Sequence, residues 1–336
     1  MRKFLVFGCV MALILPSISY SAEHAHRKPV AKHHKAKPSK HATHAATSSK
    51  IISTLRADGK YRMQAVSFSR EHGVFKEDGA TGGDLRLAST KALIINQNTG
   101  EVLYAKSTDQ PTPIASVTKL MTAMVVLDAH QSLDELLTVS EAEVDTLKGT
   151  SSRLRVGTTL TRAELLQLAL MSSENRAAAA LGNAYPGGFV PFVAAMNAKA
   201  ALLGMTRSHF VDGTGLNSEN VSTAEDLAKM VKAAYQYPEI RQVTTTASAE
   251  VAVRGMRRPV EFHNTNVLVR NSDWQIGLSK TGYISEAGRC LVMQAQIAEQ
   301  PLIIVLLDSW GKFTRIGDAQ RIRKWLESSN GSRKLG

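Results

Sequence analysis

The stretch "PIASVTKLMTAMVVL", residues 113–127, places Ser116 three positions before Lys119 at the start of an apolar run. On a helix, side chains three residues apart lie on one face, with about 5 to 6 Å between their Cβ atoms. At that distance an amine can take the proton of a serine hydroxyl, provided that burial lowers the pKa of the lysine from its usual value of about 10.4. The stretch therefore predicts either a serine nucleophile with a lysine base or the ordinary start of a buried helix.

The same spacing occurs a second time in "SWGK", residues 309–312, so spacing alone does not decide between the two interpretations. This second copy follows an expected strand and lies near the end of the chain. Ser116 follows Pro111 and Pro113, which suit the start of a helix, and it would lie at the positive end of the helix dipole. We therefore favour Ser116 and Lys119 as the candidate nucleophile and base.

A second motif, "SEN" at residues 173–175, falls between two expected helices. Acyl transfer through a serine needs a second proton relay and a hydrogen-bonding group for the substrate amide, and Ser173 and Asn175 suit these two roles. The same letters recur at residues 218–220, directly after "GTGLN", in what the sequence predicts to be a surface turn. We therefore favour Ser173 over Ser218.

A third motif, "KTG" at residues 280–282, falls on an expected strand. The lysine would supply a cation for a substrate carboxylate, and the strand would offer an edge for pairing with an extended peptide. A glycine keeps such an edge free of side chains, so that a ligand can approach the backbone closely. Lys280, Thr281 and Gly282 are therefore the candidate substrate-binding wall.

Apolar patterning around the motifs predicts strands at both ends of the domain and helices in between. Residues 91–107, "KALIINQNTGEVLYAKS", predict a hairpin that turns at Asn98-Thr99-Gly100. Apolar residues at helical spacing occupy about residues 114–236, where Ser222 to Glu225 fit a capping box. Three runs between residues 273 and 309 predict an antiparallel meander with its second turn at Gln300-Pro301, and a helix follows at residues 314–328. One sheet interrupted by a helical insertion accounts for this order.

The order and separation of the three motifs are those of penicillin-binding proteins and class A β-lactamases. Ser116 precedes Ser173 by 57 residues, and Ser173 precedes Lys280 by 107 residues. From about residue 85 to residue 328, the chain resembles the low-molecular-mass D-alanyl-D-alanine carboxypeptidase and endopeptidase family, most closely the penicillin-binding protein 7 type of endopeptidase. The stretches that carry this resemblance include "PIASVTKLMTAMV", "LMSSENRAAAAL", "VDGTGLNSENVSTAEDLAKM" and "NTNVLVRNSDWQIGLSKTGYISEAGRCLVM".

The resemblance implies a mixed α/β fold of the β-lactamase and transpeptidase type. Such a fold has an antiparallel five-stranded sheet flanked by helices, with an all-helical insertion subdomain expected here at about residues 114–236. The whole penicillin-binding domain is expected at residues 86–330.

The resemblance also implies a role for each motif residue. Ser116 would be the acylated nucleophile, Lys119 its general base and Ser173 a proton relay toward the leaving amine. Backbone N–H groups of Ser116 and Tyr283 would form the oxyanion hole, and no metal or cofactor is expected. The implied substrate-binding residues are Asn175, Lys280, Thr281, Gly282, Tyr283 and Arg315. For Arg315 a second interpretation stays open, a surface arginine at the N-terminus of a helix.

Departures from relatives narrow the expected activity. Class A β-lactamases deacylate with the glutamate of a Glu-x-x-Leu-Asn loop, and no such sequence follows Asn175. An ester between penicillin and Ser116 should therefore persist. The chain stops soon after its last expected helix, which favours a soluble periplasmic enzyme of the endopeptidase branch. The resemblance therefore implies a serine D,D-endopeptidase that cleaves peptidoglycan crosslinks. A D-alanyl-D-alanine carboxypeptidase and an inactive wall-binding homologue are the alternatives.

The N-terminal residues lie outside the resemblance. Arg2 and Lys3 precede an apolar stretch from Phe4 to Ile18 and then small residues, which predicts a signal peptide over residues 1–22 and export to the periplasm. Residues 23–50 hold seven Lys or Arg, one Glu and six His without apolar periodicity, which predicts a disordered basic tail. Its histidines suit a metal ion, but we favour a solvated tether attracted to anionic envelope polymers. Residues 51–85 form an uncertain lead-in.

The net charge of +12 is concentrated near the N-terminus. The signal segment carries two charges and the tail six, which leaves about four for everything after residue 50. We therefore expect no nucleic acid as a partner. The resemblance implies peptidoglycan crosslinks as the substrate and β-lactam antibiotics as covalent inhibitors. Cys290 is the one cysteine outside the signal segment and lies in an apolar run, so we expect a buried hydrophobic residue.

Overall fold

A computed structural model describes residues 49–55, 61–67 and 85–333. The chain divides into two compact units, Met1–Gly73 and Val74–Gly336. In the first unit, β1 (Ser49–Leu55) and β2 (Tyr61–Ser67) form an antiparallel pair in which Ser49 lies opposite Ser67. The predicted signal peptide and residues 23–48 of the predicted basic tail lie outside the described residues, so both stay predictions. Ser49 and Lys50, predicted as the disordered end of the tail, belong to β1 instead.

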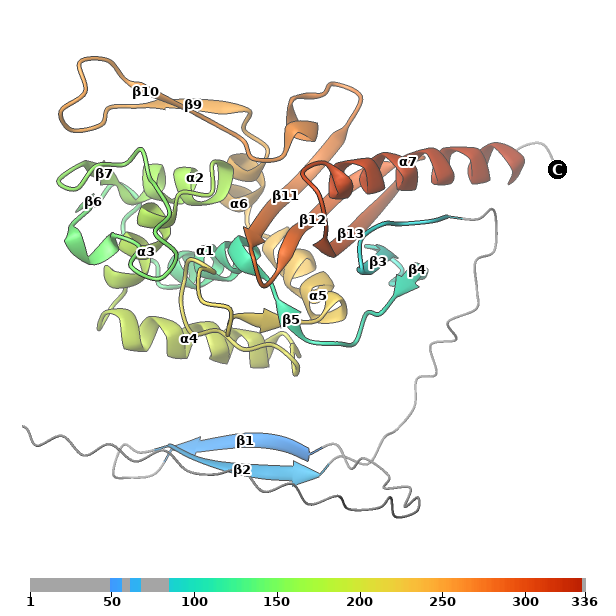
Figure 1. Cartoon of the computed structure of the whole chain (residues 1–336), viewed down its shortest axis with the longest axis horizontal. Helices are drawn as coiled ribbons and strands as arrows, with labels where there is room; N and C mark the ends of the chain where they lie inside the picture. The colour runs from blue at the N-terminus through green and yellow to red at the C-terminus, as the bar shows by residue number, and fades with distance from the viewer. Residues whose placement is uncertain (1–48, 56–60, 68–84, 334–336) are drawn as a thin grey trace, which may run out of the picture. The chain divides into compact units, whose positions relative to one another are not determined.

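The second unit is built on an antiparallel five-stranded sheet, which confirms the predicted fold class (Figure 1). In spatial order its strands are β11 (Gln275–Ile284), β12 (Gly288–Ile297), β13 (Gln300–Ser309), β3 (Lys91–Asn96) and β4 (Val102–Lys106). The predicted hairpin is β3–β4, whose turn ends at Gly100 with φ of +76°. Within this sheet, β11, β12 and β13, which come last in the sequence, thus lie beside the hairpin of β3 and β4.

Both faces of this sheet are covered, because side chains alternate between the two faces along each strand. Val292 and Val305 face the core of the helical insertion, whereas Leu291 and Ile304 face the C-terminal helix α7 (Thr314–Arg333). Figure 1 shows α7 lying along the sheet on one side and α5 on the other. Two buried faces explain why the central strands were visible in the sequence as nearly continuous apolar runs.

The insertion between β4 and β11 is mainly helical. Its helices are η1 (Ala115–Thr118, a 3-10 helix), α1 (Lys119–Asp128), η2 (Glu141–Glu143), α2 (Arg162–Met171), α3 (Asn175–Asn183), α4 (Phe189–Leu202), α5 (Ala224–Ala234), α6 (Pro238–Thr244) and η3 (Val267–Arg270). It also contains three two-stranded pairs, β5 (Thr112–Pro113) with β8 (Val221–Ser222), β6 (Leu136–Thr138) with β7 (Thr159–Thr161), and β9 (Ser248–Val251) with β10 (Val260–His263). The β6–β7 pair lies within the predicted bounds of about residues 114–236, so the insertion is not all helical as predicted. Strands of two to four residues are too short to show an alternating pattern in the sequence.

Two local predictions are corrected by the structure. Ser222 pairs with Thr112 in the β5–β8 ladder, so the N-cap of α5 is the next residue, Thr223, whose side chain accepts from the N–H of Asp226 at 3.1 Å. The turn between β12 and β13 is at Ala298 and Glu299, both with positive φ, whereas the predicted turn residues Gln300 and Pro301 begin β13. Both errors are shifts of one or two residues.

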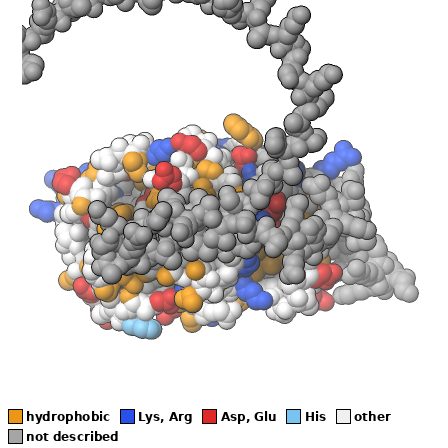
Figure 2. Space-filling view, turned by 90° about the horizontal axis from the view of Figure 1, so that it is seen from below, with side chains coloured by type: hydrophobic (Ala, Val, Ile, Leu, Met, Phe, Trp, Pro, Cys, Tyr) orange, Lys and Arg blue, Asp and Glu red, His pale blue; other side chains and the backbone are white. Residues whose placement is uncertain are grey.

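On the face of the molecule that Figure 2 shows, the charged side chains do not form one basic patch. In the space-filling view of Figure 2, Lys and Arg side chains are interspersed with Asp and Glu over the described part of the surface. Cys290 is buried and free, and burial raises the pKa of its thiol to about 11, as expected for an inert hydrophobic residue. Among the helices of the described residues, none has the length and apolar character that crossing a membrane requires.

Candidate active site

The Ser116 and Lys119 side chains meet at the junction of η1 and α1. Ser116 lies in the 3-10 turn and Lys119 is the first residue of α1, so the serine precedes the α-helix instead of opening it. In a 3-10 helix, side chains at positions i and i+3 nearly eclipse each other. The Nζ of Lys119 accordingly lies 2.8 Å from the Oγ of Ser116.

Lys119 Nζ has two further partners, both of them carbonyl oxygens. It donates to Asn175 Oδ1 at 2.8 Å and to the backbone oxygen of Thr214 at 2.6 Å. A neutral amine has two N–H groups and one lone pair, and the two carbonyl oxygens can only accept. The lone pair is then left for the hydroxyl proton of Ser116, the arrangement that a general base needs.

Burial favours this neutral form. Lys119 is fully buried, and the loss of solvation lowers the pKa of its amine to about 7. The carboxylates of Asp212 and Glu174 act in the opposite direction, but their effect is smaller. The sequence-based expectation that the apolar start of α1 lowers this pKa therefore agrees with the structure.

The second and third motifs meet each other. Ser173 lies between α2 and α3 with φ of +64°, an uncommon conformation for a residue other than glycine. Its Oγ accepts a hydrogen bond from Lys280 Nζ at 2.8 Å, and the same amine donates to the backbone oxygen of Thr281 at 2.8 Å. Burial, with smaller contributions from the charges of Lys119 and Arg315, holds the pKa of Lys280 well below its ordinary value.

Two glycines pack against the backbone around Ser116. A Cβ on Gly282 would lie 2.9 Å from the oxygen of Ile114 and 3.1 Å from the nitrogen of Ser116. A Cβ on Gly215 would lie only 1.9 Å from the oxygen of Ala115, and Gly215 has φ of +79°. The three motifs thus form one constellation, in which Asn175 contacts Lys119, Ser173 contacts Lys280, and Gly282 lies against Ser116.

The loop at residues 212–220 was misread from the sequence as a surface turn. Asp212 Oδ1 accepts from the N–H groups of Thr214 and Gly215, both at 2.6 Å, and so shapes the turn that presents the Thr214 carbonyl to Lys119. Asn220 is completely buried, and its Oδ1 accepts from the N–H of Val211 at 2.7 Å. The "SEN" copy at residues 218–220 is therefore structural, and the loop is part of the candidate site.

A second loop also reaches the candidate site without having been noticed in the sequence. Asn175 Nδ2 donates to Thr150 Oγ1 at 3.0 Å, and Thr150 Oγ1 donates in turn to Asp145 Oδ2 at 2.6 Å. Lys148 of the same loop forms an ion pair of 2.5 Å with Glu286 in the β11–β12 turn. The loop thus connects Asn175 at the start of α3 to the turn that follows β11. These contacts join residues that are far apart in the sequence, so no local pattern predicts them.

The remaining candidates lie beside this constellation. Arg315, in the first turn of α7, is 9% exposed, so its interpretation as a surface arginine is wrong. Its Nη1 donates to the oxygen of Lys312 at 3.2 Å, and its buried Nε has no hydrogen-bond partner among the described residues.

Tyr283 is 57% exposed, with the Arg289 guanidinium 4.4 Å from its ring centre. In the second serine–lysine copy, the Oγ of Ser309 lies 2.7 Å from that of Ser89 instead.

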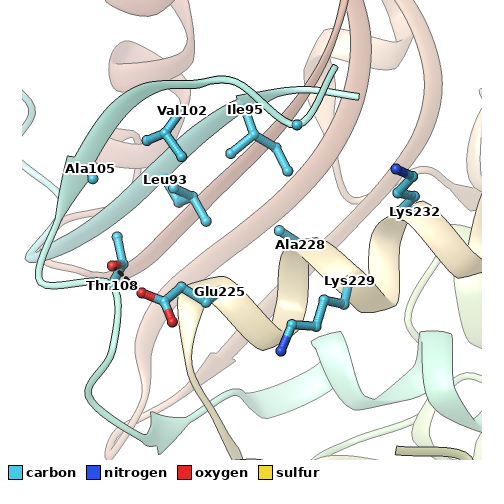
Figure 3. Close-up of a pocket in the computed structure, with 10 residues that line it drawn as sticks. Leu93, Ile95, Val102, Ala105, Thr108, Glu225, Ala228, Lys229 and Lys232 are labelled. Carbon is cyan, nitrogen blue, oxygen red and sulfur yellow. Dashed lines mark hydrogen bonds between the residues drawn. The ribbon is translucent and has the colours of Figure 1, made fainter. Parts of the chain in front are cut away.

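Two hollows lie away from these residues. One, of about 220 Å³, lies between α5 and the β3–β4 hairpin, with Leu93 and Val102 on its apolar side and Lys229 on its rim (Figure 3). The other, of about 260 Å³, is lined mainly by α2 and α6. Neither contains a candidate site residue. Within the described part of the chain, no group of three or more His, Cys, Asp or Glu side chains could hold a metal ion.

Comparisons with known proteins agree with this arrangement. The family profile for D-alanyl-D-alanine carboxypeptidases, peptidase family S11, matches residues 78–311. The chain is 51% identical to a D-alanyl-D-alanine endopeptidase of Pseudomonas aeruginosa over 72% of this chain and 78% of that protein. It is 45% identical to a D-alanyl-D-alanine endopeptidase of Escherichia coli over 79% of this chain and 86% of that protein.

Solved structures lead to the same family. The Streptomyces K15 DD-transpeptidase superposes with a TM-score of 0.67 at 31% identity, covering 72% of this chain and 98% of that one. A D-alanyl-D-alanine carboxypeptidase from Mycobacterium tuberculosis superposes with a TM-score of 0.65 at 26% identity, covering 73% and 94% of the two chains. The resemblance seen in the motifs is thus confirmed, and the chain belongs to the D-alanyl-D-alanine carboxypeptidase family of serine peptidases.

Proposed function

We propose that this protein is a serine D,D-peptidase that cuts peptide crosslinks in peptidoglycan through a seryl acyl-enzyme. One observation supports this chemistry: the buried amine of Lys119 lies 2.8 Å from Ser116 Oγ, and its other two hydrogen-bond partners are carbonyl oxygens. Endopeptidase activity is favoured because the relatives at 51% and 45% identity bear that name, whereas those named carboxypeptidases match at 29% to 32%. Trimming of terminal D-alanine is the second candidate.

In the acylation step, Lys119 takes the hydroxyl proton of Ser116, and Oγ attacks the carbonyl carbon of the D-alanyl peptide bond. The N–H of Ser116, which lies in the first turn of η1, and that of Tyr283 would hold the negative oxygen of the tetrahedral intermediate. The C–N bond then breaks, and the proton taken up by Lys119 would pass through Ser173 to the leaving amine. Water hydrolyses the ester, and the serine regains its proton.

The substrate would lie between the start of α3, where Asn175 lies, and β11. Asn175 would hold a substrate amide, while Lys280 and Arg315 would attract a terminal carboxylate. Thr281, whose Oγ1 donates to Thr265 Oγ1 at 2.6 Å, and Gly282 would form the wall along which an extended peptide pairs with the strand. Among the described strands β11 has a sheet neighbour on one side only, so its other edge is available for such pairing.

Digestion of purified, crosslinked muropeptides tests the proposal. We expect the crosslinked dimers to be converted to monomers faster than terminal D-alanine is released from monomers. Benzylpenicillin should add one acyl group per chain, located on Ser116 by mass spectrometry, and the ester should persist because no deacylating Glu-x-x-Leu-Asn loop follows Asn175. Release of D-alanine without dimer cleavage would establish the carboxypeptidase instead. No adduct, or an adduct on Ser309, would refute the assignment of the nucleophile.

The acylation rate should depend on pH through Lys119. Its pKa of about 7 means that the amine is protonated at lower pH and cannot accept the serine proton. We therefore expect the second-order rate constant for benzylpenicillin to rise through pH 7 and level off above it, falling roughly tenfold per pH unit on the acid side. Acylation reactions quenched after timed intervals between pH 5 and 9 measure this profile. Thermal unfolding curves at each pH check that the protein is folded over this range. A flat profile would contradict the assignment of Lys119 as the base.

The proposed substrate places the protein in the cell envelope. We propose that residues 1–22 direct export to the periplasm and that residues 23–50 tether the enzyme loosely to anionic wall polymers, since seven of their side chains are Lys or Arg and one is Glu. Sequencing the N-terminus of the protein recovered from cells tests the first point, because cleavage after Ser21 or Ala22 leaves a chain that starts at Ala22 or Glu23.

A further inference from the structure

Three exposed aromatic side chains gather at one corner of the sheet. Trp310 is 77% exposed, Phe313 64% and Tyr283 57%. Only one other aromatic side chain, Phe189, is among the strongly exposed large hydrophobic residues of the described chain, so three of these four aromatics lie in one place. Such a concentration of exposed apolar surface marks an interaction site more often than scattered single residues do.

Strand register shows that the three residues are neighbours. Tyr283 of β11 lies opposite Arg289 of β12, and Arg289 lies opposite Ser309 of β13, the residue before Trp310. Neighbouring strands are about 4.8 Å apart, so the backbone from Tyr283 to Ser309 spans about 10 Å. Phe313 follows after one turn of chain, through Gly311 with φ of +86°. We call Tyr283, Trp310 and Phe313, with Arg289 and Lys312, the aromatic corner.

Cationic groups lie over two of its three rings. The Arg289 guanidinium is 4.4 Å from the ring centre of Tyr283, and Lys312 Nζ is 5.4 Å from that of Phe313. The corner therefore presents aromatic faces next to positive charges, which suits a ligand that has apolar C–H surfaces and carboxylates together.

The aromatic corner is continuous with the candidate active site but faces another way. Tyr283 directly follows Gly282, which lies against Ser116. Lys280 points toward Ser173, and because side chains alternate along a strand, Tyr283, three positions further on, points to the opposite face of β11. A ligand that touches both must pass around the free edge of β11, which a peptide joined to sugar rings can do and a penicillin molecule cannot.

We propose that the aromatic corner binds the glycan strand of the substrate, with its sugar rings stacked on Trp310 and Phe313. This inference rests on the proposed function, since it assumes that the peptide being cut is attached to a glycan. The rings of N-acetylated sugars offer C–H faces to aromatic side chains, and the free carboxylates of the attached stem peptides complement Arg289 and Lys312. The corner thus holds the polymer while Ser116 acts on its peptide.

The double variant Trp310→Ala/Phe313→Ala tests the site. Both side chains are exposed, and the hydrogen bonds of this loop use the backbone oxygens of Trp310 and Phe313, so alanine leaves those bonds in place. We expect KM for crosslinked dimers that carry their disaccharides to rise about tenfold, with kcat unchanged. For the same crosslinked peptides after enzymatic removal of the disaccharides, KM should equal that of the wild type. Phe189→Ala, an exposed aromatic at the start of α4, is the matched control and should change neither value.

Several outcomes would overturn the proposal. An equal rise in KM for both substrates would show that the corner binds peptide, and no rise for either would show that it binds neither. Acylation by benzylpenicillin should stay within twofold of the wild type, and a larger fall would mean that the corner merely supports the site. Loss of binding to anionic phospholipid vesicles, with unchanged cleavage, would assign it to a lipid surface. Cleavage of dimers by the wild type tests the proposed function separately.

Discussion

Lys119→Ala should lower the rate of acylation by benzylpenicillin by about 10⁴-fold or more, because Ser116 loses the amine that we propose as its base. Ser116→Ala removes the oxygen that would be acylated, so this variant should form no adduct at all. Intact-protein mass spectrometry after timed incubation with the drug measures the effect. Acylation within tenfold of the wild type would mean that another residue is the base.

A fall in activity must be separated from a loss of fold. Removing the amine leaves Asn175 Oδ1 and the Thr214 carbonyl without their donor. A buried group left unsatisfied costs roughly 1 to 3 kcal/mol, and that range is an upper bound here because both residues are half-buried. The melting temperature should therefore drop while the circular dichroism spectrum stays native. The matched control is Lys199→Ala, which removes a lysine held by Asp128 and Tyr237, and it should acylate at nearly the wild-type rate.

Gly215→Ala should reduce acylation by at least about 10²-fold, although no atom of Gly215 takes part in the chemistry. The new Cβ would lie 1.9 Å from the oxygen and 2.3 Å from the carbon of Ala115, and 2.9 Å from the nitrogen of Ser116. These are backbone atoms, so the clash can be relieved only by moving the turn that carries Ser116. Displacement of a reacting group by about 1 Å can cost about a hundredfold in rate.

Gly100→Ala is a closely matched control for this substitution. Gly100 has φ of +76°, against +79° at Gly215, but its added Cβ would have nothing within 4 Å. The left-handed backbone alone costs about 1 to 2 kcal/mol in the free energy of unfolding, and both variants carry that cost. We expect Gly100→Ala to melt earlier but to acylate normally. If Gly215→Ala acylated as fast as Gly100→Ala, the close packing around Ser116 would have no part in catalysis.

Contacts within one turn of a helix were predictable once the helix itself was predicted. Ser116 and Lys119 are three residues apart, and a tight helical turn brings their side chains together whatever surrounds them. The turn at Gly100 and the apolar runs of β12 and β13 were predictable in the same way, because the backbone itself sets these periods. The N-cap of α5 was misplaced by one residue because Ser222 belongs to a ladder of only two residue pairs.

The loop at residues 212–220 shows why local composition can mislead. Glycine, threonine and asparagine are typical of exposed turns, so "GTGLN" was predicted to lie on the surface. The same residues also suit a buried turn whose polar groups are all bonded, as those of Asn220 are to Val211 and Asp212. What distinguishes the two cases is the packing partner, here the turn around Ser116, and that partner lies elsewhere in the sequence.

By itself, the sequence determined the family, the order of strands and helices, and the three motifs, because each of these depends on side chains that differ from their neighbours. Only the tertiary structure decided which groups surround Lys119 and how strongly burial lowers its pKa. Thr214 is 95 residues from Lys119 and contributes a backbone oxygen, a group that every residue possesses and that no letter of the sequence reveals. Thr150 is 25 residues from Asn175 and meets it through space. Desolvation of the amine likewise comes from several segments packed together, so it exists only once the chain has folded.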